Sequence, residues 1–140
     1  MNEVNLSKSS IKQLNPMKYK LVERKNPQNP QAPGKLYATP VNEGKVSQKN
    51  IAADIVLLSS LARGDVGNVI DSLIDTVPKY LLMGKSVSLG DLGTLRISFS
   101  SEGVNAAEEF TVNKISGVRV LFTPSPTLRQ SLTGIKFEKA

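Results

Sequence analysis

The stretch from Asp65 to Leu81 places the tightest constraint on what this 140-residue chain can fold into. Apolar side chains recur there at intervals of three and four residues: Val66, Val69, Ile70, Leu73, Ile74, Val77 and Leu81. This spacing puts them on one side of an α-helix, whereas the side chains of a strand alternate between two faces. Asp65 is a suitable N-cap, and Gly84 is well placed to end the helix. Pro78 lies inside the pattern and should kink the helix or tighten its last turn.

A shorter helix is predicted just before it. Ile51, Ile55 and Leu58 recur at helical spacing, with support from Ala52 and Val56. Ser47 precedes this run and has the side chain of a good N-cap. We therefore expect a helix from residue 47 to about residue 59, and a turn in the sequence SSLARGD that follows it.

The residues before these helices alternate instead. MKYKLVER, residues 17–24, puts Tyr19, Leu21 and Glu23 on one side, and the other side is mostly basic. This pattern predicts a strand with a basic face. KLYATPVN, residues 35–42, predicts a second short strand that Pro40 interrupts or ends. A proline-containing loop of about ten residues connects the two, so we expect a loose hairpin.

Strands are also predicted after the helices. KSVSLGDLGTLRISFSS, residues 85–101, indicates a strand pair whose corner is marked by Gly90 and Gly93. A polar connector follows, and then FTVNKI and GVRVLFTPS predict another strand or a bulged pair. Pro124 and Pro126 open a short helix, SPTLRQSL, and a basic tail ends the sequence. Strands and helices are segregated along the chain, which predicts the α+β class.

The composition excludes several kinds of chemistry. The chain has no Cys and no His, which rules out thiolate or imidazole catalysis and Cys/His zinc sites. Asp71 and Asp75 fall on the polar side of the long helix, where a solvated face is the simpler interpretation. No glycine-rich phosphate-binding motif is present. We expect neither an enzyme nor a small-molecule substrate, and no cofactor or metal.

The positive charge is placed unevenly. Residues 1–50 carry nine Lys/Arg and three Asp/Glu, while residues 51–140 carry nine of each, so the first 50 residues hold the whole net charge of +6. Such asymmetry favours a polyanion-binding arm or face, although a basic arm can also serve only solubility. The apolar runs are too short to span a bilayer, and the N-terminus lacks the apolar stretch of a signal peptide. We expect a cytoplasmic protein without membrane contact.

Basic residues on the predicted strands are the candidate functional groups. Such side chains pair with phosphates or enter a minor groove, although the solvent face of any strand also carries Lys and Arg. Aromatics are only 5% of the chain, which argues against a base-stacking platform. The candidate DNA-binding residues are Arg24, Lys25 and Lys35 in the N-terminal hairpin, Arg96, Lys114 and Arg119 in the later strands, and Arg129 in the last helix.

Two stretches resemble the HU/IHF family of histone-like bacterial DNA-binding proteins. In residues 62–98 an amphipathic helix ends in a glycine and leads into a G-x-G-T-F-like corner, matched by Gly84, Val87, Leu89, Gly90, Gly93, Thr94 and Leu95. VLFTPSPTLRQSL resembles the family's F-R-P-G-x-x-L-K-x-x-V segment, with Phe122, Pro124, Leu128 and Arg129 in register. The resemblance covers about residues 45–137. The strands before it resemble a longer subgroup with an N-terminal strand extension.

The resemblance implies an HU/IHF-like fold, intertwined with a second copy into an obligate homodimer. It also implies a saddle-shaped sheet that extends two arms around the minor groove of double-stranded DNA in the bacterial nucleoid, and a role in DNA condensation with little sequence specificity. We expect a weakly structured leader at residues 1–16 and one HU-like domain at 17–140, comprising the extension, 17–44, and the core, 45–137.

The sequence departs from the family at its arm. Residues 100–111, SSEGVNAAEEFT, contain no proline and no basic residue, but they carry three glutamates. In the family's F-R-P-G segment the proline lies between Arg and Gly. Here Thr123 and Ser125 stand on either side of the matching Pro124. Two hypotheses stay open: an architectural DNA-binding dimer, and an HU-like dimeric structural or interaction module that has lost strong DNA bending. Likewise RKNPQNPQAPGK, residues 24–35, is either a structural loop or a relocated basic contact.

Overall fold

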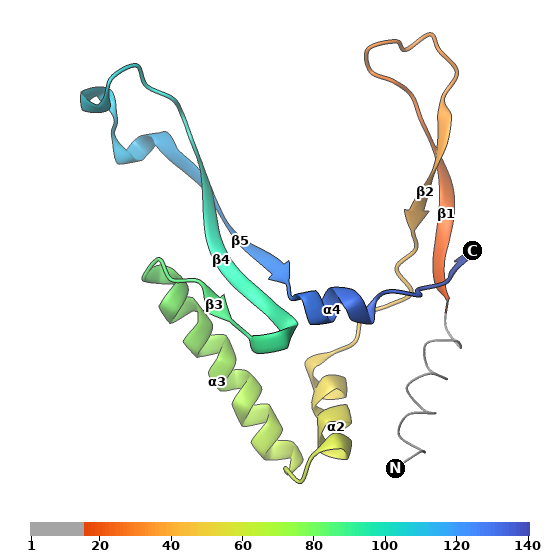
Figure 1. Cartoon of the computed structure of the whole chain (residues 1–140), viewed down its shortest axis with the longest axis vertical. Helices are drawn as coiled ribbons and strands as arrows, with labels where there is room; N and C mark the ends of the chain where they lie inside the picture. The colour runs from red at the N-terminus through yellow and green to blue at the C-terminus, as the bar shows by residue number, and fades with distance from the viewer. Residues whose placement is uncertain (1–15) are drawn as a thin grey trace. The chain divides into compact units, whose positions relative to one another are not determined.

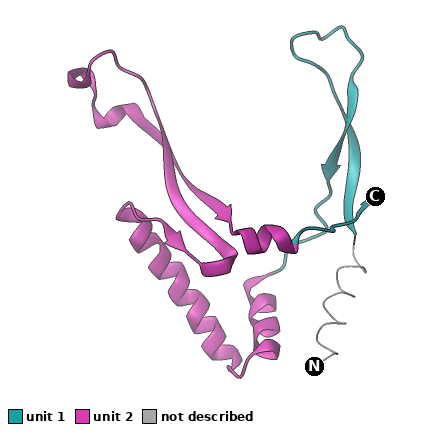
Figure 2. Cartoon of the chain, viewed as in Figure 1, with its two compact units in different colours: residues 1–46, 132–140 teal, residues 47–131 magenta. Residues whose placement is uncertain are grey.

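The structure is a computed structural model that describes residues 16–140. The expected leader therefore falls outside the described residues, except for Pro16. In chain order the described elements are two strands, two helices, three strands, a short helix and a last strand (Figure 1). The mixed α+β class predicted from the sequence is confirmed. The described residues divide into two compact units, one of residues 16–46 with 132–140 and one of residues 47–131 (Figure 2).

The first unit contains a three-stranded sheet in the order β2-β1-β6. β1 (Met17–Arg24) pairs antiparallel with β2 (Lys35–Pro40), and residues 25–34 connect them. The predicted hairpin is thus confirmed, and β2 ends at Pro40. β6 (Phe137–Lys139) runs parallel to β1. The sequence predicts only a basic tail here, because three residues are too short to show a period, and their extended state depends on pairing with Met17–Tyr19.

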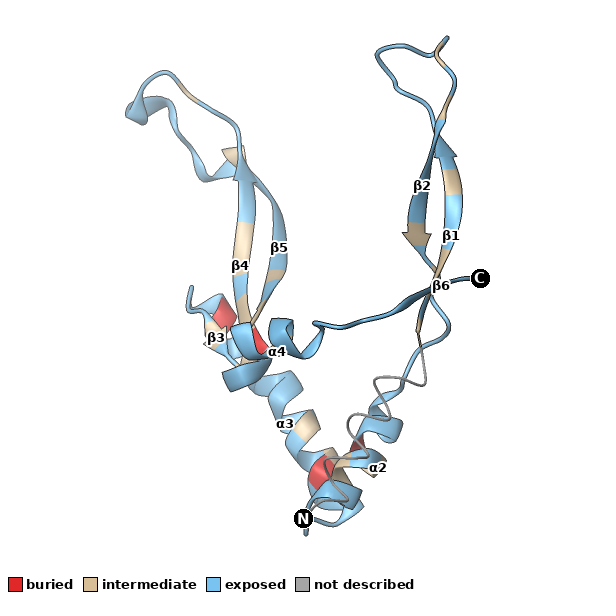
Figure 3. Cartoon of the chain, turned by 45° about the vertical axis from the view of Figure 1, so that its right-hand side comes forward, coloured by how far each residue is buried: buried red, intermediate tan, exposed pale blue. Residues whose placement is uncertain are grey.

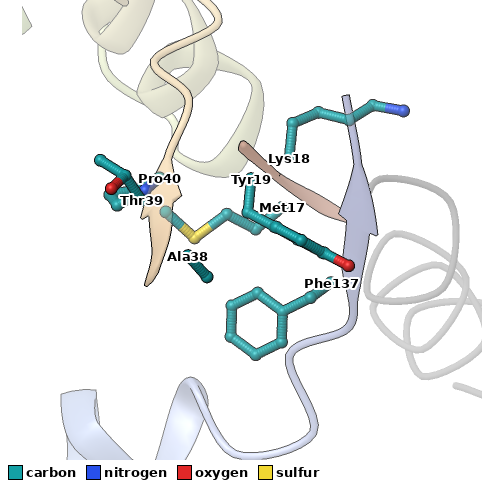
Figure 4. Close-up of a pocket in the computed structure, with 7 residues that line it drawn as sticks. All are labelled: Met17, Lys18, Tyr19, Ala38, Thr39, Pro40 and Phe137. Carbon is teal, nitrogen blue, oxygen red and sulfur yellow. The ribbon is translucent and has the colours of Figure 1, made fainter. Parts of the chain in front are cut away.

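The two faces of this sheet differ sharply. Residues paired across neighbouring strands share a face, so the register assigns each side chain to one side. One face is mostly apolar and carries Met17, Tyr19, Leu21, Leu36, Ala38, Pro40 and Phe137. A hollow of about 420 Å³ opens between the residues of β1, β2 and β6 shown in Figure 4. The other face carries Lys18, Lys20, Arg24 and Lys35, as the alternation predicts for β1.

The second unit begins with α2 (Gln48–Leu58). The Ser47 hydroxyl accepts a hydrogen bond from the Asn50 N–H at 3.2 Å, which confirms the predicted N-cap. At the other end Ser59 is the C-cap, and its N–H donates to the Val56 carbonyl at 3.4 Å. The predicted bounds of this helix are therefore correct to within one residue.

α3 (Arg63–Leu82) begins three residues before the predicted start, because its N-cap is Ala62 and not Asp65. Asp65 is not the N-cap but the third helical residue, because the preceding residues Arg63 and Gly64 are already helical. Its carboxylate reaches back and accepts from the Ala62 N–H at 3.3 Å, which also places a negative charge at the positive end of the helix. The helix continues through Pro78, and Gly84, with φ of +75°, follows its end as predicted.

The second sheet has the order β3-β4-β5. β3 (Val87–Ser88) and β4 (Gly93–Ser101) flank the one-turn helix η1 (Gly90–Leu92), so the predicted glycine-marked corner is confirmed. β5 (Ile115–Pro124) pairs with β4, with a register shift between Ser98 and Ser100. α4 (Pro126–Ser131) follows as predicted.

The segment that joins β4 to β5 differs from the prediction. FTVNKI was expected to be extended, but its strand begins only at Ile115. Two one-turn helices occupy the connection instead: η2 (Ala107–Glu109) and η3 (Val112–Lys114). Local bonds, such as that from the Lys114 N–H to the Thr111 carbonyl at 3.0 Å, satisfy this backbone without a strand partner.

Few of the described residues are buried (Figure 3). Among the described residues the buried hydrophobic side chains are Ala52, Val66 and Leu81. On the helices of the second unit, Leu57 and Leu58 stay 84% and 87% exposed, and Leu82 is 88% exposed. A folded domain normally covers such side chains. In the apolar stripe predicted for the long helix, Val66 and Leu81 are buried, but Val69, Leu73 and Ile74 are exposed in a single chain.

Candidate nucleic-acid interface

The β4–β5 ribbon separates polar from apolar side chains. Leu95 pairs with Phe122, and Ile97 pairs with Val120, which gives one apolar face. The other face contains the pairs Thr94–Thr123, Arg96–Leu121 and Ser98–Arg119. Two of the predicted DNA-binding residues, Arg96 and Arg119, are thus brought to the same face of the ribbon. The small polar residues beside them were not predicted as site residues, although their alternation with Leu95 and Ile97 was a usable signal.

Arg119 is held in place at the register shift of the ribbon. Its Nη1 donates to the Ser100 hydroxyl at 3.3 Å and to the Gly117 carbonyl at 3.2 Å. Gly117 has φ of +62°, a conformation that favours glycine. A guanidinium has five N–H donors, so several are left for a ligand. The Ser100 hydroxyl and the Gly117 carbonyl therefore orient the Arg119 side chain before any ligand arrives.

Lys114 is a weaker candidate than the sequence suggests. Its Nζ lies 3.5 Å from a carboxylate oxygen of Glu102, and the two side chains are 32% and 75% exposed. An ion pair this exposed contributes about 1 kcal/mol or less to stability. It nevertheless compensates the lysine charge locally, so a phosphate near Lys114 would meet less net attraction.

Arg129 lies in the last turn of α4, and Ser125 fixes the start of that helix. The Ser125 hydroxyl accepts from the Leu128 N–H at 3.0 Å and donates to the Asp91 carbonyl in η1. The Ser125 N–H also donates to the Leu92 carbonyl at 3.2 Å. The sequence shows Ser125 only as a departure from the family's glycine. In the structure it joins α4 to the glycine corner and so positions Arg129.

The connection between β4 and β5 is acidic, as its sequence indicates. Glu108 and Glu109 are exposed in η2, and no Lys or Arg occurs between Glu102 and Lys114. Phe110 and Val112 are 41% and 77% exposed beside them. This arm therefore has neither the cations that attract a phosphate backbone nor a proline that could wedge between base pairs.

The remaining predicted residues belong to the first unit. Arg24, Lys25 and Lys35 lie where β1 and β2 meet the connecting loop. The Arg24 guanidinium carbon lies 5.7 Å from the centre of the Tyr37 ring, which is within the range of a cation–π contact. The predicted site residues thus form two groups. These three lie in the first unit, and the second unit holds Arg96, Lys114, Arg119 and Arg129.

Residues 16–140 contain no group of three or more acidic side chains placed to hold a metal ion. None of their helices is both long enough and apolar enough to cross a membrane.

A helix pair followed by a two-faced β-ribbon with arginines on its polar face is the arrangement expected of an HU-like domain. The family model described as "HU domain fused to wHTH, Ig, or Glycine-rich motif" matches residues 16–139. The chain belongs to this HU-domain family. The resemblance to an HU-like family, predicted from the sequence, is therefore confirmed. The matched residues include the N-terminal strands, β1 and β2.

A solved structure supports the same fold. The chain is similar to a candidate bacterial DNA-binding protein from Bacteroides vulgatus ATCC 8482, with a TM-score of 0.60 and 17% sequence identity. The similarity covers 88% of this chain and 47% of that one, so this chain spans about half the length of its structural neighbour. No curated protein matches the sequence.

Proposed function

We propose that the chain is a non-enzymatic, histone-like protein that binds double-stranded DNA as a homodimer in the bacterial nucleoid, with little sequence specificity. The observation that carries this proposal is the β4–β5 ribbon, which places Arg96 and Arg119 on one face and its apolar residues on the other. Membership of the HU-domain family supports DNA as the ligand.

The proposed homodimer follows from the uncovered apolar side chains. Val69 and Ile74 on α3 are 62% and 56% exposed, and Val120 and Phe122 on the ribbon are 54% and 47% exposed. Burial of such side chains contributes about 25 cal/mol for each Å² removed from water. A second copy offers the same apolar helices and ribbon, so a symmetric pair can cover both sets. The dimer would supply the core that one chain lacks.

The proposed DNA contacts act mainly on phosphates. With the apolar face of the ribbon packed in the dimer, the face with Arg96 and Arg119 is left for the ligand. Arginine N–H groups and the nearby Thr and Ser hydroxyls suit phosphate oxygens. Such contacts carry no sequence information directly, which accounts for the low specificity we propose. Arg129 on α4 would add a further charge.

The acidic arm limits what this protein does to DNA. An arm without cations gains no phosphate contacts, and it has no proline to insert between base pairs. We therefore propose binding with little bending. The same observation favours a second candidate function, an HU-like dimeric structural or interaction module that has lost strong DNA bending.

Fluorescence anisotropy with labelled linear, nicked and pre-bent duplexes at two salt concentrations tests the proposal. We expect micromolar or tighter binding at low salt that weakens steeply as salt rises, because bound phosphates release counterions. Similar affinity for linear and pre-bent DNA would support binding with little bending. No binding to any duplex at low salt would reject the DNA-binding function and leave the structural module.

A further inference from the structure

We propose that the β1–β2 hairpin carries a second phosphate-binding surface for the nucleic-acid backbone, separate from the β4–β5 ribbon. It consists of Lys20, Arg24, Lys25 and Lys35, together with the hollow beneath the connecting loop. The proposal rests on the proposed function only in taking nucleic acid as the ligand, since it concerns a different unit of the chain.

The strand register concentrates positive charge at the loop end of the hairpin. Arg24 pairs directly with Lys35, and Lys20 lies on the same face of β1. Like charges that face each other across two strands destabilise a sheet. A hairpin that served only as a structural connection would gain stability from a neutral or opposite-charge pair at this position. A bound phosphate would remove the repulsion.

No carboxylate neutralises these cations among residues 16–140. The ion pairs within residues 16–140 join Lys18 to Glu138 and Lys114 to Glu102. Neither pair includes a cation of the proposed surface. Glu23 is the nearest acid in sequence, but the register puts it on the opposite face of the sheet. There its side chain lies against Gly34, where an added Cβ would fall 2.5 Å from the Glu23 Cγ. At the loop end of the hairpin, Arg24, Lys25 and Lys35 therefore keep their charge, while Lys18 at the other end of the face is paired with Glu138.

The loop forms a concave site rather than a loose connection. A hollow of about 530 Å³ is lined by Arg24, Lys25 and Lys35 together with Pro27, Pro33 and Tyr37. Local bonds shape it: the Asn29 N–H donates to the Asn26 carbonyl at 3.1 Å, and the Ala32 N–H donates to the Asn29 carbonyl at 3.2 Å. The Arg24 contact with the Tyr37 ring restricts the guanidinium further. Three cations therefore converge on one shaped site before a ligand binds.

The apolar face of the same sheet indicates which face is free for a ligand. Met17, Leu21 and Phe137 lie on the face opposite to the cations, and burying that face is favourable. Once it is covered, the basic face is the one that meets solvent and ligands. This is the arrangement already seen in the ribbon, so each unit of the chain pairs one apolar face with one basic face.

The test compares full-length variants of equal charge. One removes the hairpin cations (Lys20→Gln, Arg24→Gln, Lys25→Gln, Lys35→Gln), and the control removes four exposed lysines elsewhere (Lys45→Gln, Lys49→Gln, Lys79→Gln, Lys85→Gln). Anisotropy against a linear duplex and a single strand is measured from low to physiological salt. Each lost phosphate contact should lower the slope of log K against log salt by about 0.9 for duplex and 0.7 for single strands.

We expect the hairpin variant to lower the slope by about 2 to 4 relative to the control, on the duplex, the single strand or both, with circular dichroism unchanged. Replacing the same residues by the other basic residue (Lys→Arg, Arg24→Lys) should restore the slope. Equal slopes for the hairpin and control variants would overturn the proposal. The same variants are also tested on phosphatidylserine vesicles. If the hairpin variant lost binding to these vesicles but kept its nucleic-acid binding, the proposal would likewise be overturned. If the wild type binds no nucleic acid at low salt, the proposed function fails as well.

Discussion

Arg96 and Arg119 lie on the same face of the β4–β5 ribbon, because Arg119 pairs with Ser98, two residues along the strand from Arg96. Neither residue has an ion pair among residues 16–140. On a face that otherwise carries mainly Thr and Ser, the two guanidinium groups supply the charge. This relationship links the fold of the ribbon to the DNA binding that we propose.

The orientation of Arg119 can be tested separately from its charge. Ser100→Ala removes the hydroxyl that accepts from Nη1 but keeps the arginine. We expect a loss of DNA affinity of about two- to fivefold, because the arginine keeps its charge. For Arg119→Ala we expect a loss of about tenfold to a hundredfold, because hydrogen bonds to charged groups are worth about 1.5–3 kcal/mol. Ser131→Ala is the matched control, since its hydroxyl bonds within α4 instead. Full affinity in Ser100→Ala would show that this hydrogen bond does not position the arginine.

The acidic arm should repel DNA if it lies near the duplex. Glu108→Lys with Glu109→Lys replaces two negative charges by two positive ones in η2. We expect tighter binding and a steeper salt dependence, measured by anisotropy on a linear duplex. The pair Asp71→Lys and Asp75→Lys on α3 controls for the change in net charge. An equal effect in both variants would place the arm away from the DNA.

Gly93 in the glycine corner should not tolerate a larger residue. Gly93 has φ of +154°, and a Cβ there would fall 2.6 Å from the Phe122 ring. Gly93→Ala should therefore lower the free energy of unfolding by about 1–3 kcal/mol or more, through strain and overpacking. Gly103→Ala meets no atom within 4 Å and is the control. Chemical denaturation measures both, and equal stabilities would contradict the packing we describe.

The homodimer makes a prediction about α3. Val69→Glu with Ile74→Glu places two charges on its exposed apolar stripe. Buried without partners, these charges would cost several kcal/mol, so we expect a monomer or an unfolded chain in sedimentation velocity. Asn68→Glu with Thr76→Glu alters other exposed positions of the same helix and should leave the oligomer intact. A wild-type sedimentation mass of 15.1 kDa would contradict the dimer directly.

The pairing of β6 with β1 should depend on alkaline pH. The hydrogen bond from Lys18 to Glu138, 2.6 Å long, raises the pKa of the lysine above its ordinary value of 10.5. This contribution is complete below pH 10.5 and is lost as pH rises through the raised pKa. Wild type should therefore be slightly more stable than Lys18→Gln at pH 8, and the difference should vanish at the highest pH. A difference that is independent of pH would mean that the ion pair does not cause it.

The sequence predicted those elements whose signals are local. Ser47, Gly84 and Pro40 each mark the end of an element by their own chemistry, and the structure places those ends within one or two residues. β6 has no such signal, because its three residues are extended only through pairing with β1, far away in the sequence. The start of α3 was misplaced because Asp65 can act either as an N-cap or as the third helical residue.

The candidate site shows the same division. Composition and alternation identified Arg96, Arg119 and the hairpin cations as candidates. Only the register shows that Arg96 and Arg119 share a face and that Arg24 faces Lys35. The compensation of Lys114 by Glu102 and the role of Ser125 depend on contacts between segments that are distant in sequence, which no local pattern contains.

The most direct test of the central claim is the affinity of Arg96→Glu with Arg119→Glu for a linear duplex at low salt. The control is Lys49→Glu with Lys79→Glu, which makes the same change in net charge on the helices. We predict at least a hundredfold loss of affinity for the arginine variant and a much smaller loss for the control, with both variants folded. Equal affinities would contradict DNA binding through this face of the ribbon.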